Sequence, residues 1–151
     1  MYKKILVPLD GSSLSEAALP HACVLAKALQ AQVLFLRVVV FPDQDLGDIP
    51  IEYAASSEVL AEMKRYLEHV ATNLRRAGVA VTCYAVSGRV ADTILDFAEH
   101  HAVDLIVMST HGRAAALRWL MGSIADKVIH SAHIPVLLIR ENKKSHAHIG
   151  Q

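Results

Sequence analysis

The chain of 151 residues is long enough for one domain with a sizeable core, and a content of 53% hydrophobic and 20% charged residues is typical of a soluble α/β protein. Fifteen basic side chains balance fifteen acidic ones, which excludes a net charge that would attract nucleic acid or an anionic membrane. No apolar run approaches the roughly 18–20 residues that span a bilayer, the N-terminus has no signal-peptide pattern and the two cysteines are isolated, so we expect a cytoplasmic protein.

The first part of the chain predicts a strand, a helix and a second strand. Lys4–Leu9 is short and apolar, as in a strand that is buried on both faces of a parallel sheet, and Asp10 follows it directly. Ser13–Glu16 fits a capping box, which begins a helix that continues through a kink at Pro20. The next strand is expected at Gln32–Val40, which is apolar and β-branched.

The rest of the chain repeats this alternation. Phe41–Ala55 has no clear period and is expected to be a loop, and a long helix then runs from Ser56 or Ser57 to Gly78. A helix that ends at His100-His101 is also expected. Further strands are predicted at Val79–Val86, Leu105–Met108 and Pro135–Arg140. Strands that alternate with helices predict a five-stranded parallel sheet with helices on both faces, in one α/β domain at residues 1–140, and Glu141–Gln151 forms a polar tail.

The stretch that follows the strand Leu105–Met108 predicts an anion site. Ser109 to Gly112 form a turn, and a second glycine, Gly122, precedes Ser123 and a helical pattern. Unpaired amides and the positive end of the helix dipole meet where such a helix begins, and glycine lets the backbone approach a phosphate closely. Ile124, Val128 and Ile129 lie on one face of this predicted helix.

The spacing of Gly112, Gly122 and Ser123 resembles the nucleotide-binding motif of the universal stress protein family. That motif reads Gly, two residues, Gly, nine residues, Gly and then Ser or Thr. Ser109 stands where the motif has its first glycine. The added Cβ and hydroxyl would either crowd the ribose or hydrogen-bond to it, and the sequence leaves both outcomes open.

The resemblance spans Lys3 to about Arg140 and implies a Rossmann-like fold of the adenine nucleotide alpha hydrolase type, with strand order 3-2-1-4-5. In that order Asp10 and the loop that begins at Ser109 reach one crevice, where open α/β sheets hold ligands. In relatives the acid at the position of Asp10 contacts the nucleoside, and the backbone at the position of Val38 reads the adenine edge. The nucleotide-binding residues that the resemblance implies are Pro8, Leu9, Asp10, Val38, Met108, Ser109, His111, Gly112, Arg113, Gly122, Ser123 and Ile124.

The resemblance also implies a function, namely a regulatory or stress-response protein that binds ATP or ADP, with Mg²⁺ carried by the nucleotide. A weak ATP hydrolase or phosphotransferase is one alternative, although no general base is evident beside the loop and no P-loop lysine is present. A dimeric adaptor that no longer binds nucleotide is another, which Ser109 and the run Ala114–Ala116 favour. No catalytic residue is predicted. No metal site is predicted either, because the nine histidines lack acidic or cysteine partners at ligand spacing.

The last strand predicts a homodimer. In the family order it lies at the edge of the sheet, and an apolar edge strand without a charge or a bulge tends to pair with another chain. Relatives pair this strand between two subunits about a twofold axis. The residues expected at the interface are Val136, Leu137, Leu138 and Ile139.

Overall fold

The structure is a computed structural model that describes residues 1–40, 57–111 and 121–140. The predicted loop Phe41–Ala55, the predicted tail Glu141–Gln151 and the run Ala114–Ala116 lie outside the described residues, as do two predicted site residues, Gly112 and Arg113. Within the described ranges, no helix combines the length and the apolar character that a bilayer span requires.

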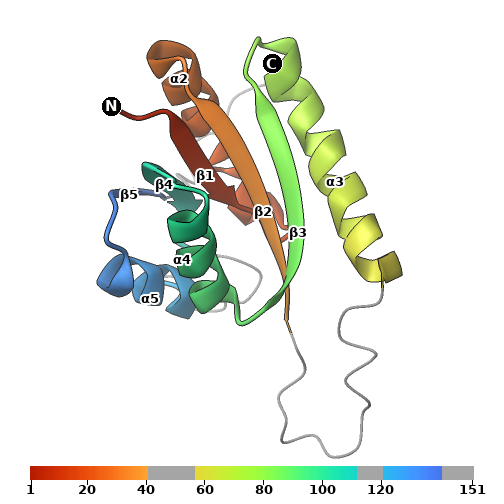
Figure 1. Cartoon of the computed structure of the whole chain (residues 1–151), viewed down its shortest axis with the longest axis vertical. Helices are drawn as coiled ribbons and strands as arrows, with labels where there is room; N and C mark the ends of the chain where they lie inside the picture. The colour runs from red at the N-terminus through yellow and green to blue at the C-terminus, as the bar shows by residue number, and fades with distance from the viewer. Residues whose placement is uncertain (41–56, 112–120, 141–151) are drawn as a thin grey trace, which may run out of the picture.

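Strands and helices alternate along the chain, as predicted (Figure 1). The strands are β1 (Lys4–Pro8), β2 (Gln32–Val40), β3 (Val81–Gly88), β4 (Leu105–Ser109) and β5 (Val136–Ile139). The helices are α1 (Ser13–Glu16), α2 (Leu19–Leu29), α3 (Ser57–Arg76), α4 (Val90–His100) and α5 (Ser123–Ser131). Every strand pairing is parallel, and the strand order β3-β2-β1-β4-β5 confirms the expected topology.

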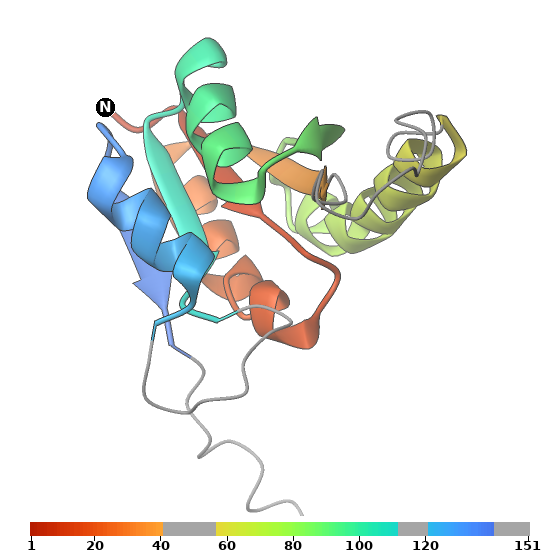
Figure 2. The same ribbon diagram turned by 90° about the horizontal axis from the view of Figure 1, so that it is seen from below.

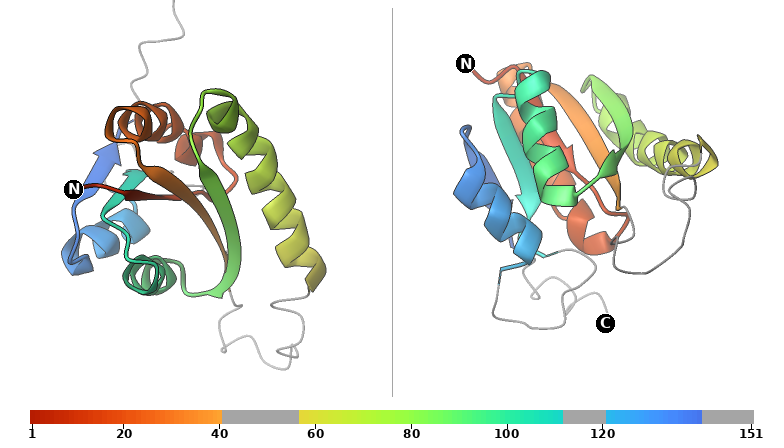
Figure 3. Two further views of the ribbon diagram at one scale, coloured as in Figure 1. Left: turned by 45° about the horizontal axis from the view of Figure 1, so that its top comes forward. Right: turned by 60° about the horizontal axis from the view of Figure 1, so that its bottom comes forward.

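Two hydrophobic cores lie on opposite faces of the sheet, because successive side chains of a strand point to opposite sides. Ile5 and Val7 of β1 pack in the core beneath α2 and α3, whereas Leu6, which lies between them, packs in the core beneath α4 and α5. Figure 3 shows α2 and α3 on one face of the sheet and α4 and α5 on the other. Burial on both faces explains why the central strands are continuous apolar runs.

The first helical segment differs from its prediction. The cap is Ser12, whose Oγ accepts a hydrogen bond from the N–H of Ser15 at 3.2 Å. The helix α1 stops after Glu16, and α2 begins at Leu19, so the predicted single helix with a kink at Pro20 is wrong. Proline lies in the first turn of α2, where its missing N–H costs no hydrogen bond and its fixed φ favours a helix start.

The apolar face of α5 that the sequence predicts is only partly buried. Ala125 and Val128 are buried, but Ile124 and Ile129 are 40% and 37% exposed. The helix lies over the β4–β5 end of the sheet, so that only a narrow stripe of its surface is covered (Figure 3). Ala125, which the predicted apolar pattern does not include, packs in the core beneath α4 and α5.

Candidate functional site

Three neighbouring strands bring predicted site residues to one level at the carboxyl edge of the sheet. Leu6 of β1 is in register with Leu34 of β2 and with Ile106 of β4. The residues four positions further along these three segments are Asp10, Val38 and Thr110. Figure 2 views the molecule from this end. The topology therefore brings the first and the fourth strand segments to a shared edge, as expected.

Asp10 is held by the turn that joins β1 to α1. Its Oδ1 accepts hydrogen bonds from the N–H of Ser12 at 2.8 Å and from the Ser12 hydroxyl. Its own N–H donates to Oγ of Ser15 at 3.3 Å. Between them Gly11 has a φ of +84°, a conformation that favours glycine. These contacts fix the half-buried carboxylate at the edge of the sheet.

The backbone of Val38 lies beyond the point where β1 stops pairing with β2. The pairing of β1 with β2 ends at Pro8 and Leu36, and the carbonyl of Leu36 accepts a hydrogen bond from the N–H of Leu9 at 2.9 Å. Backbone groups two residues apart in a strand point to the same side. The N–H and C=O of Val38 therefore point toward the side of β2 on which β1 has ended. This geometry fits the base-reading role that the resemblance gives to Val38.

The end of β4 and the beginning of α5 are joined through Thr110. The carbonyl of Thr110 accepts a hydrogen bond from the N–H of Gly122 at 2.8 Å, and its N–H donates to the carbonyl of Ile139 at 3.0 Å. Oγ of Ser109 donates to the carbonyl of His111 at 2.7 Å. Oγ1 of Thr110 lies 2.8 Å from Nδ1 of His111. Residues on both sides of the segment 112–120 are thus fixed relative to each other.

Gly122 is needed for a close approach and not for an unusual backbone conformation. Its φ is −59°, which any residue adopts, but an added Cβ would lie 3.0 Å from the carbonyl oxygen of Thr110. Gly122 is the N-cap of α5, and no side chain among the described residues caps this helix. The amides of the first turn, beginning with Ser123, therefore lack intrahelical partners and are available to an anion.

The remaining predicted site residues differ in exposure. Leu9 and Met108 are buried in the two cores, at 3% and 6% exposure, so a ligand can reach them only through their backbone. Pro8 is half-buried and Ile124 is exposed. The structure places these residues around the same edge as Asp10 and Gly122 but leaves few of their side chains open to a ligand.

One charged residue near the site was missed at the sequence level. Arg37 lies in β2 next to Val38, and its Cζ is 5.2 Å from the centroid of the Tyr66 ring. The hydroxyl of Tyr66 donates to Oε1 of Glu16 at 2.6 Å. The signal was present in the sequence, since a single arginine interrupts the otherwise apolar run VLFLRVVV.

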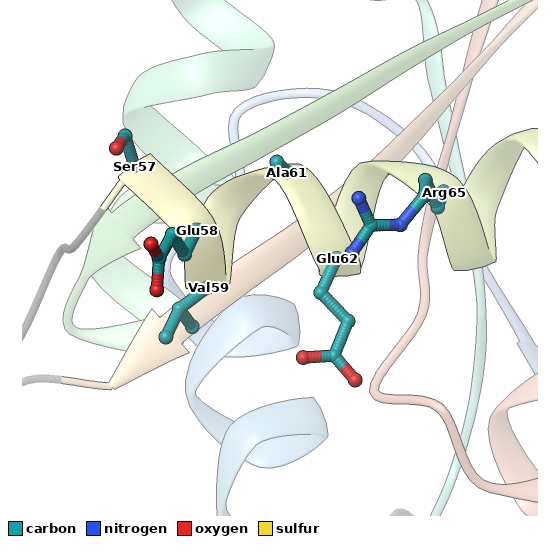
Figure 4. A pocket seen from close by; sticks show the side chains of 6 residues that line it. All are labelled: Ser57, Glu58, Val59, Ala61, Glu62 and Arg65. Carbon is teal, nitrogen blue, oxygen red and sulfur yellow. The ribbon is translucent and has the colours of Figure 1, made fainter.

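An open hollow of about 690 Å³ lies elsewhere, on the first turns of α3. The side chains of Val59 and Glu62 extend from the same side of this helix (Figure 4). The lining residues are Ser57, Glu58, Val59, Ala61, Glu62 and Arg65, and none of them is a predicted site residue. Within the described part of the chain, no group of three or more His, Cys, Asp or Glu side chains is placed to hold a metal ion.

Comparisons with known proteins agree with this architecture. The sequence model of the Universal stress protein family matches residues 1–140. Universal stress protein MJ0531 of Methanocaldococcus jannaschii is 39% identical over 148 residues, which cover 95% of this chain and 85% of that protein. The solved structure of hypothetical protein MJ0577 from the same organism superposes with a TM-score of 0.82 at 29% identity and covers 94% of this chain and 98% of that one. The universal stress protein of Archaeoglobus fulgidus, solved in complex with dAMP, has the same fold, with a TM-score of 0.66, 24% identity and coverage of 91% and 97%.

Proposed function

The chain belongs to the universal stress protein family, and on this premise we propose that it binds an adenine nucleotide, ATP or ADP, at the carboxyl edge between β1 and β4. The observation that carries the proposal is the convergence of Asp10 and the uncapped beginning of α5 at this edge. The dAMP complex of the Archaeoglobus fulgidus protein supports it, because a protein with the same fold was solved with an adenine nucleotide bound.

Each part of the nucleotide has a matching group in this site. The carboxylate of Asp10 accepts hydrogen bonds from the ribose hydroxyls, and the backbone of Val38 pairs with the adenine edge. The amides of the first turn of α5, beginning with Ser123, bind the phosphates, whose negative charge the helix dipole favours. Mg²⁺ enters with the triphosphate and needs few protein ligands.

Titration calorimetry with ATP, ADP and GTP tests this function. We expect ATP or ADP to bind at submillimolar concentration, and GTP to bind at least tenfold more weakly because its base edge presents a different set of donors and acceptors. Absence of adenine-nucleotide binding at millimolar concentration would leave the dimeric adaptor as the function. Steady phosphate release on the order of tens per second would instead identify a hydrolase, since that rate is typical of enzymes.

The cellular role follows from the family. We propose that the chain works in the cytoplasm as a regulatory or stress-response module in which nucleotide binding is the switch. The matched region supports a single domain at residues 1–140, with residues 141–151 as an appended tail.

We also propose a homodimer that forms through β5. This strand pairs only with β4 among the described strands, and Leu137 is 37% exposed at the sheet edge. An apolar edge of this kind is stabilised when a second copy pairs with it. Val136, Leu138 and Ile139 complete the proposed interface.

Leu137→Lys should convert the dimer to a monomer, because the mutation places two like charges in the paired edge. Light scattering at micromolar concentration measures the mass. Val24→Lys on α2 is the matched control, since Val24 is 67% exposed and lies on a different element. A wild-type protein that is monomeric, or a Leu137→Lys variant that remains dimeric, would contradict this interface.

A further inference from the structure

Arg37 lies behind the proposed site, on the other face of the sheet. Phe35 packs in the core beneath α2 and α3, whereas Val38 packs against the core beneath α4 and α5. By strand alternation the side chain of Arg37 shares the face of Phe35, where it lies over the Tyr66 ring of α3. Placing a charged side chain on this apolar face costs free energy unless the charge is paired or hydrogen-bonded.

The guanidinium also lies directly against the turn that carries Asp10. A Cβ built on Gly11 would be 2.2 Å from Nη1 of Arg37 and 3.0 Å from its Cζ. The guanidinium therefore occupies the space that any side chain at position 11 would need. The guanidinium thus lies close to both the Gly11 backbone and the Tyr66 ring.

Tyr66 contacts the other end of the same segment, at the end of α1. The Tyr66 hydroxyl donates to Oε1 of Glu16, the last residue of α1. Burial, the hydrogen bond to Glu16 and the charge of Glu16 raise the pKa of Tyr66 well above its usual range, and the nearby Asp10 carboxylate raises it further. Tyr66 thus remains a protonated donor, and the side chains of Arg37 and Tyr66 contact the segment from Asp10 to Glu16 near its two ends.

We propose that Arg37 is a positioning residue, which holds Gly11 from the far face of the sheet and so sets the Asp10 carboxylate for the ribose. This role rests on the proposed function, since it assigns Arg37 to the nucleoside half of that site. A planar guanidinium suits the position because it stacks on an aromatic ring, and a lysine ammonium does not reproduce that geometry. The phosphate half of the site, at Gly122, does not involve Arg37.

Binding of three ligands separates this role from general stabilisation. In Arg37→Gln, adenosine and ATP should each bind about tenfold more weakly, whereas tripolyphosphate should bind as in the wild type. Arg37→Lys should recover less than half of the lost adenosine binding free energy. Arg75→Gln is the matched control, because Arg75 of α3 pairs with the exposed Glu68. This variant should bind all three ligands as the wild type does.

A double mutant tests whether Arg37 acts through Asp10. In the Asp10→Asn background, Arg37→Gln should cause no further loss of adenosine binding, since the group that it positions is already impaired. Equal losses of adenosine and tripolyphosphate affinity, or full additivity with Asp10→Asn, would overturn the positioning role.

Amide hydrogen exchange in the nucleotide-free protein tests the role of Arg37 independently of nucleotide binding. The amides of Ser12 and Ser15 are hydrogen-bonded within the turn, and their exchange in Arg37→Gln should be at least fivefold faster than in the wild type. Arg37→Lys offers the same readout should Arg37→Gln not fold. A wild type that binds no adenosine refutes the nucleotide site alone, whereas unchanged exchange at Ser12 and Ser15 refutes the role of Arg37.

Discussion

Asp10→Ala is expected to weaken ATP binding about thirtyfold, which corresponds to about 2 kcal/mol. Hydrogen bonds to a charged group contribute roughly 1.5–3 kcal/mol each, and this variant removes the carboxylate that we propose binds the ribose. It also removes the acceptor for the Ser12 N–H and hydroxyl, so the turn itself loosens. Titration calorimetry with ATP measures the loss.

Asp10→Asn is the control that separates charge from geometry. The asparagine oxygen still accepts from Ser12, so the turn is retained while the negative charge is lost. We expect this variant to bind ATP more weakly than the wild type but more tightly than Asp10→Ala. Affinity equal to that of the wild type in both variants would remove Asp10 from the site.

Gly122→Val is expected to weaken ATP binding at least tenfold, about 1.4 kcal/mol, in a protein that still folds. The new Cβ would lie 3.0 Å from the Thr110 carbonyl oxygen and 3.7 Å from Cα of His111. The backbone must shift to relieve this contact, and the hydrogen bond from Gly122 to Thr110 shifts with it. The first amides of α5 would then no longer point at the phosphates.

Two further variants test whether the size and the position of the added side chain cause this loss of affinity. Gly122→Ala adds only the Cβ and should weaken binding less than Gly122→Val. Ser131→Val places the same side chain at the exposed last position of α5 and should leave affinity unchanged. Unchanged affinity in a folded Gly122→Val protein would mean that the phosphates bind elsewhere.

The strands were predictable because each is a short apolar run between polar or glycine positions. Gln32–Val40 agrees with β2 at both ends. The third strand begins later than predicted, because the N–H of Val79 donates to the carbonyl of Leu74 at 3.0 Å and closes α3. A residue that caps a helix through its backbone has no side-chain signature, so this boundary was not visible in the sequence.

The separation of α1 from α2 could not be derived from the capping pattern. Ser12 and Ser13 both precede residues that suit a helix start, and only the hydrogen bond from Ser15 to Ser12 decides between them. Pro20 was a sequence signal for the separate helix, because proline is common in the first turn of a helix and Pro20 lies in the first turn of α2.

The site was predictable where the motif spacing carries it and hidden where it depends on partners far away in the sequence. Gly122 was found from its distance to Gly112, but Thr110 was not, because it acts through backbone groups bonded to Gly122 and Ile139. Arg37 was missed for the same reason, since Gly11 and Tyr66 become its neighbours only in the fold.

The role of Ser109 illustrates the same limit. Its sequence position allowed two readings, a side chain that crowds the ribose or one that hydrogen-bonds to it. Its Oγ donates to the carbonyl of His111 at 2.7 Å, so the hydroxyl closes the turn after β4. A bond within the turn was a third outcome that neither reading of the motif included.

The most direct measurement is a titration of ¹⁵N-labelled protein with ATP followed by amide chemical shifts. The largest changes should occur at the carboxyl edge, in the amides of Gly11, Val38, His111, Gly122 and Ser123. The hollow on the first turns of α3, from Ser57 to Arg65, should show no change. Shifts confined to α3, or no shifts at millimolar ATP, would contradict an adenine-nucleotide site between β1 and β4.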